Sequence, residues 1–191
     1  MKKTITLIAT VLIFIVLISA TRYKSSTAAP ASHTGAPDEK TCTESGCHDD
    51  NKINKGSANL SIEIGDKTAK YIAGQTYSIK IKIEDENVSR FGFQVVALST
   101  ETNKNIGKFT ITDKERTQIV NNAYKLEDRQ YVTYTFNGTD AVKKGLGEWT
   151  VNWTAPSTTN EAVVFYVAAV SGNDDMTDKG DFVYTNKLKL K

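Results

Sequence analysis

From residue 58 onward, hydrophobic and polar residues alternate along the chain in a series of short runs. In residues 77–83, a tyrosine and three isoleucines occupy every second position, with serine and lysine between them. A period of two sends one set of side chains to each face of a strand, so this run predicts a strand with one buried face. Residues 90–99 and 162–170 are apolar on both faces, which indicates central strands.

The same analysis predicts about nine strands and no helix. They cover residues 60–64, 77–83, 90–99, 108–112, 116–120, 130–136, 149–153, 162–170 and 182–190. Turns rich in Gly, Asn and Asp separate them. This pattern predicts an all-β fold, an antiparallel immunoglobulin-like β-sandwich. Trp149 and Trp153 share one face of their strand with Val151, so we expect them in the core rather than on an exposed sugar-binding platform.

The N-terminus has the pattern of an export signal. Lys2 and Lys3 precede an apolar run that extends to Ser19, and Ala20 supplies a small residue for cleavage. Residues 1–20 are therefore predicted to be a signal peptide, the alternative being an uncleaved N-terminal anchor. Either interpretation places the rest of the chain outside the cytoplasm, in the periplasm, on the cell surface or secreted. Any contact with a membrane is expected only through an uncleaved N-terminus.

Three further segments follow the signal. Residues 21–40 are rich in Ser, Thr, Ala and Pro and are predicted to be a flexible linker. Residues 41–55 contain both cysteines of the chain and form a predicted cofactor segment. Residues 56–191 are predicted to be the sandwich.

Composition excludes several classes of function. Lysine and arginine total 24 and aspartate and glutamate 22, so the near-balanced charge gives no basis for nucleic-acid binding. With two histidines, both near the N-terminus, no Ser-His-Asp arrangement is credible, and we expect no enzymatic activity. Four aspartates crowd residues 173–181, but their spacing does not fit a calcium loop, so a solvated acidic loop is expected and calcium is not.

The motif whose side chains could bind a cofactor is Cys42-x4-Cys47-His48. Two thiols could bond covalently to haem c, with His48 as the proximal ligand of the haem iron. The usual spacer is two residues, and Ser45-Gly46 would let the longer one bend. His33 and Met176 are candidates for the sixth ligand, which stays open. The alternatives are a Cys42–Cys47 disulfide, a metal site one ligand short of a closed zinc site, or two free thiols.

Several other motifs, taken in order, resemble those of the reeler domain, the N-terminal module of reelin, and of bacterial relatives called choice-of-anchor V domain proteins. The matching stretches are Gly35-Ala36-Pro37, Arg90-Phe91-Gly92-Phe93-Gln94, Arg129-Gln130-Tyr131-Val132, Trp149-Thr150-Val151-Asn152-Trp153 and Val164-Phe165-Tyr166. The resemblance implies an immunoglobulin-like sandwich. It also implies haem, because the bacterial relatives usually carry Cys-x-x-Cys-His. They tend to have a histidine where this chain has Tyr134, so that position carries no ligand role here.

These observations lead to two hypotheses. The first is an exported monohaem protein similar to c-type cytochromes, which transfers electrons to a redox partner or binds a small ligand at its haem. The alternative is a cofactor-free extracellular adhesion or assembly module, capable of self-association, with a Cys42–Cys47 disulfide.

Overall fold

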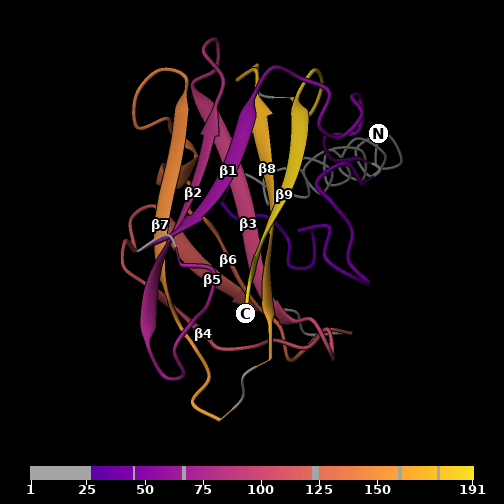
Figure 1. Ribbon diagram of the computed structural model, residues 1–191. Helices are drawn as coiled ribbons and strands as arrows, with labels where there is room; N and C mark the ends of the chain where they lie inside the picture. The colour runs from indigo at the N-terminus through magenta and orange to yellow at the C-terminus, as the bar shows by residue number, and fades with distance from the viewer. Residues whose placement is uncertain (1–26, 45, 66–67, 122–124, 159–160, 176) are drawn as a thin grey trace, which may run out of the picture.

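The protein is a sandwich of two antiparallel β-sheets (Figure 1). The structure is a computed structural model, and it describes residues 27–44, 46–65, 68–121, 125–158, 161–175 and 177–191. The predicted signal peptide and Met176 lie outside these residues. Within them, no helix is both long enough and apolar enough to cross a membrane.

The first sheet has four strands in the order β1-β2-β7-β4, and the second has five in the order β5-β6-β3-β8-β9. The strands are β1 (Asn59–Ile64), β2 (Thr76–Glu84), β3 (Arg90–Ser99), β4 (Lys108–Ile111), β5 (Thr117–Asn121), β6 (Gln130–Tyr134), β7 (Leu146–Thr154), β8 (Val163–Gly172) and β9 (Phe182–Leu190). A 3-10 turn, η2 (Asn137–Thr139), follows β6. The predicted all-β antiparallel sandwich is confirmed.

One strand begins earlier than its sequence pattern indicated. β7 starts at Leu146, before the predicted residue 149, and Gly147 pairs with Ile83 of β2. Gly147 lies against Phe91, and a Cβ there would be 2.9 Å from that ring. The glycine allows this close packing, and its lack of a side chain is why the alternation was not visible there.

The core lies between the two sheets. Ile79, Ile81 and Ile83 of β2 are completely buried, as the alternation predicted. Trp149 stacks on Phe93 at a ring-centroid distance of 4.4 Å, and its indole N–H donates to the carbonyl of Gly138. Trp153 is also fully buried, so the core placement of both tryptophans is confirmed.

The outer face of the five-stranded sheet is covered by the chain that precedes the first strand. We call residues 27–42 the strap. It includes residues 27–40 of the predicted linker, and its Ala29, Thr34 and Ala36 are buried. Ala36 packs with Val96 and other side chains of the sheet. The strap leads directly into the cysteine segment and so fixes where that segment lies.

Candidate functional site

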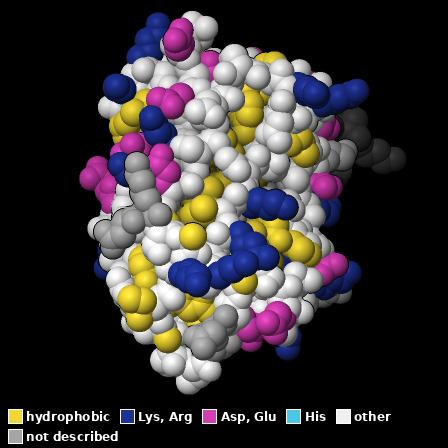
Figure 2. Space-filling view, viewed as in Figure 1, with side chains coloured by type: hydrophobic (Ala, Val, Ile, Leu, Met, Phe, Trp, Pro, Cys, Tyr) yellow, Lys and Arg dark blue, Asp and Glu magenta, His cyan; other side chains and the backbone are white. Residues whose placement is uncertain are grey.

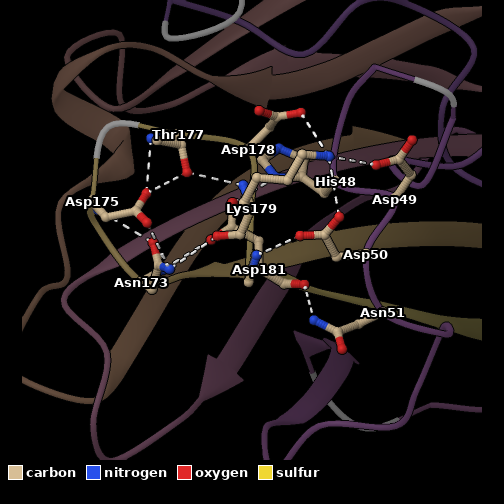
Figure 3. A network of polar contacts seen from close by, with 11 residues as sticks. His48, Asp49, Asp50, Asn51, Asn173, Asp175, Thr177, Asp178, Lys179 and Asp181 are labelled. Atoms are coloured by element: carbon tan, nitrogen blue, oxygen red, sulfur yellow. Dashed lines mark hydrogen bonds and ion pairs between the residues drawn. The ribbon is translucent and has the colours of Figure 1, made fainter.

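The cysteine segment faces the loop that joins β8 to β9 (Figure 3). His48 and Asn51 come from the segment, and Asp181 comes from the end of the loop. The two stretches are more than one hundred residues apart in sequence. Their contacts create an ordered polar surface at one end of the sandwich, which we call the loop surface: residues 48–51 and 173–181, without Met176.

Cys42 lies in an apolar site and not at the surface. Its side chain packs with Ala168, Val170 and Val183 on the outer face of the sheet. Burial, with a smaller effect from the neighbouring Cys47, raises the pKa of the Cys42 thiol to about 12. At neutral pH the group is therefore a protonated, unreactive thiol.

Cys47 is half-buried, and both cysteines are free thiols. The predicted Cys42–Cys47 disulfide is therefore wrong. That prediction was based on the closeness of the two cysteines in sequence and on an oxidising compartment. Neither shows where a side chain lies in the fold.

His48 forms the central contact of the loop surface. Its ring Nδ1 donates to Asp181 Oδ2 at 2.6 Å, and the Asp181 side chain is 5% exposed. The other carboxylate oxygen of Asp181 accepts the backbone N–H of Asn173 at 2.9 Å. Asn51 donates its side-chain amide to the Asp181 carbonyl. One buried carboxylate thereby ties the segment to both ends of the loop.

Lys179 forms the second contact between the same two stretches. Its Nζ lies 3.0 Å from Asp49, 3.1 Å from Asp50 and 3.6 Å from Asp178. Hydrogen bonds to the first two carboxylates raise the pKa of Lys179, and the same ammonium group lowers the pKa of Asp49. Lys179 and these three carboxylates form an ion cluster that joins the cysteine segment to the loop.

His33, the candidate ligand from the strap, does not reach the loop surface, and Asp174 and Asp175 of that surface have other partners. The ring Nδ1 of His33 donates to the carbonyls of Pro30 and Ala31, within the strap itself. Asp174 pairs with Arg90, and Asp175 accepts from Thr177. In the part of the chain that the structure describes, no three His, Cys, Asp or Glu side chains are placed to hold a metal ion.

The structure also reveals a basic strip that sequence analysis did not single out. Lys187, Lys189 and Lys191 are all exposed at the end of the chain. Figure 2 shows lysine and arginine side chains gathered over this C-terminal part of β9. Among the described residues, none of the three forms an ion pair, unlike Lys80 and Lys82 of β2. The alternation of lysine with leucine in residues 187–190 was the signal that could have identified the strip.

Comparison with known proteins identifies the domain. A family model described as the Reeler domain matches residues 40–175. The crystal structure of the Reelin-N domain of F-spondin is 21% identical, with a TM-score of 0.51, and the match covers 73% of this chain and 91% of that one. The human F-spondin reeler domain is 20% identical, with the same TM-score, covering 73% and 94%. No curated protein matches the chain.

These findings correct the haem hypothesis. The matching family and the two F-spondin structures are described as a Reeler or Reelin-N domain, and none of these descriptions names haem. Haem c needs two thiols at one edge of a porphyrin, whereas the Cys42 thiol is packed against the sheet. The predictions of covalent haem at Cys42 and Cys47, of His48 as an iron ligand and of a c-type cytochrome function are therefore wrong. With a family model that matches residues 40–175 of its 191, the chain belongs to the Reeler domain family.

Proposed function

We infer that the protein is a cofactor-free, extracytoplasmic adhesion or assembly module without enzymatic activity. The observation that carries this proposal is the membership of the chain in the Reeler domain family over residues 40–175. The predicted signal peptide supports the location. The Cys42 thiol is buried, and the Asp181 carboxylate already accepts hydrogen bonds within the protein. Because neither group is open to a substrate, both support a role without enzymatic catalysis.

The surface best suited to a partner is the basic strip. The three lysines lie together and form no ion pair with any residue that the structure describes, so no neighbouring carboxylate there compensates their positive charges. Such a surface attracts anionic groups, and the attraction weakens as salt screens it. The proposed partner is therefore an anionic polymer or an acidic protein face at the cell surface. Self-association through other surfaces is compatible with this assignment.

The test is an adhesion assay with beads that carry residues 21–191. We expect the beads to bind cells of the producing species, and to bind less as the salt concentration rises. Lys187→Gln with Lys189→Gln should reduce bead binding at least severalfold, because two uncompensated charges are removed.

The matched control is Lys80→Gln with Lys82→Gln, which has the same change in net charge. These lysines lie 3.3 Å from Glu148 and 2.7 Å from Glu84, so their charges are already compensated. The control should bind nearly as well as the wild type. Equal losses for both variants would point to net charge alone, and beads that bind no cells would overturn the adhesion proposal.

A further inference from the structure

A cavity lies beside the turn that joins β2 to β3. Its volume is about 590 Å³. Three segments line it: Ser57 before β1, residues 84–87 at the end of β2 and in the turn, and residues 143–146 at the start of β7. Small-molecule sites in proteins have volumes of about 300–1,000 Å³. The cavity is therefore large enough for a small ligand, and it shares no residue with the loop surface or the basic strip.

Backbone hydrogen bonds fix the walls of the cavity. The N–H of Asp85 donates to the carbonyl of Gly145, and the N–H of Gly145 donates to the carbonyl of Val88, both at 3.0 Å. Gly145 has φ of +80°, and a Cβ there would lie 3.0 Å from the Cα of Glu86. The glycine thus allows the two turns to approach this closely. Because backbone bonds hold both turns, the cavity is formed before any ligand arrives.

One carboxylate in the cavity wall is buried. Asp85 is 9% exposed. Its Oδ2 accepts the hydroxyl of Ser171 at 2.8 Å, and its Oδ1 accepts the hydroxyl of Ser57 at only 3.4 Å. Both donors are neutral, and among the residues that the structure describes no cationic side chain forms an ion pair with Asp85. Buried charges are normally paired with opposite charges, so Asp85 favours a ligand that carries a cationic group.

The other turn carries two cations. Lys143 and Lys144 line the cavity and are exposed. Within the described part of the chain, neither forms an ion pair with a carboxylate. Glu84, on the first wall, is already paired with Lys82 at 2.7 Å. The cavity therefore has a buried carboxylate on one turn and two ammonium groups on the other.

This distribution of charge discriminates among classes of ligand. A metal ion needs several ligands, and no three His, Cys, Asp or Glu side chains in the described ranges are placed to hold one. A simple anion would meet the Asp85 carboxylate, and a simple cation would meet Lys143 and Lys144. A zwitterion avoids both conflicts, because it offers an opposite charge to each wall.

We propose that the cavity binds a small zwitterion, an amino acid or a short peptide. Its ammonium group binds the Asp85 carboxylate, and its carboxylate binds Lys143 and Lys144. Both contacts are charge-assisted hydrogen bonds, which are stronger than those between neutral groups. This site goes beyond the proposed adhesion function, because it uses other residues and another kind of ligand.

The first test titrates residues 21–191 with glycine, diglycine and triglycine and follows binding by NMR. The three probes differ in the distance between their ammonium and carboxylate groups. At least one of them should bind with saturation. Failure of all three to bind at millimolar concentration overturns the proposal.

Blocking the ends of the probe that binds most tightly tests each charge in the unmodified protein. Acetylation of its amine removes the positive charge, and amidation of its carboxylate removes the negative charge. Each blocked compound should bind at least tenfold more weakly than the free zwitterion, because it loses one charge-assisted contact. Equal affinity of the free and blocked compounds would contradict a site with two charged walls.

Variants of the lysine wall test where the probe binds. Lys143→Gln with Lys144→Gln should weaken binding at least severalfold, and these exposed positions should tolerate the change without loss of folding. Lys187→Gln with Lys189→Gln is the matched control, with the same change in net charge, and should keep the affinity of the wild type. Equal losses in both variants would mean that net charge alone causes binding, which overturns the site.

Asp85→Asn tests the other wall, because it keeps the shape of the side chain and removes its charge. The variant should no longer distinguish the free probe from the acetylated one, and a retained tenfold preference would contradict the role of Asp85. Bead adhesion separates this site from the proposed function. It should survive Lys143→Gln with Lys144→Gln, so either the cavity or the adhesion surface can fail its test without the other.

Discussion

The carboxylate of Glu39 and the guanidinium of Arg129, 90 residues apart, form an ion pair from which water is almost completely excluded. The Nε atom of Arg129 has no hydrogen-bond partner in the structure, so Glu39 is the principal compensation for its charge. This pair fixes the strap on the sheet.

Removing Glu39 should therefore be costly. Glu39→Ala leaves a buried arginine without its counter-ion, and we expect a loss of about 3–5 kcal/mol in the free energy of unfolding. Urea denaturation measures it. Glu44→Ala is the control, because the Lys40–Glu44 pair is exposed and should contribute less than about 1 kcal/mol. Similar losses in the two variants would show that the buried pair does not hold the strap.

The two cysteines should differ sharply in reactivity. Cys47 is half-buried and should react with a thiol reagent at pH 8 in the native protein. Cys42, with a pKa of about 12 in an apolar site, should react only after denaturant is added. Mass spectrometry of the labelled chain counts the modified thiols. Two rapid modifications in the native state would contradict the burial of Cys42.

Cys42 should also make the fold sensitive to alkali. Its thiol keeps its proton in the folded state up to a pKa of about 12, whereas the unfolded chain releases it near the ordinary value of 9.0. The unfolded state therefore loses the proton first, and the free energy of unfolding falls as the pH rises above 9.0. The slope from this one group approaches about 1.4 kcal/mol per pH unit. Cys42→Ala should show a shallower decline between pH 9 and 11 in urea denaturation, and an unchanged slope would refute the assignment.

Alanine substitutions at two glycines with positive φ should distinguish the stability cost of backbone strain from that of steric conflict. Gly74 has φ of +75° with open space around it, so Gly74→Ala should cost about 1 kcal/mol from conformation alone. Gly107 has φ of +69°, and a Cβ there would lie 2.4 Å from Trp153 Nε1. Gly107→Ala should cost about 2 kcal/mol more than Gly74→Ala, because the indole must move. Thermal unfolding followed by tryptophan fluorescence compares them, and equal effects would contradict this difference.

The fold could be predicted from the sequence because the alternation records burial directly. Ile79, Ile81 and Ile83 face the core as their spacing required. The boundaries that were misplaced, such as the start of β7, involve a glycine that contributes backbone pairing but no side-chain signal.

The site could not be predicted in the same way. The Cys42-x4-Cys47-His48 motif suggested haem because spacing alone does not show which side chains point to solvent. The strap contacts were also invisible, because Gln94 binds backbone atoms, which are the same in every sequence. Arg129 was seen only as part of a family motif, and its partner Glu39 lies far away in the chain.

The position of the strap at the N-terminal side of every strand has a consequence for biosynthesis. The ribosome makes Glu39 long before it makes Arg129, and Gln94 also follows the segment that it binds. The strap must therefore wait, uncovered and hydrated, until β3 and β6 have paired and completed its binding site. Docking of the strap is therefore a late step in the folding of the chain.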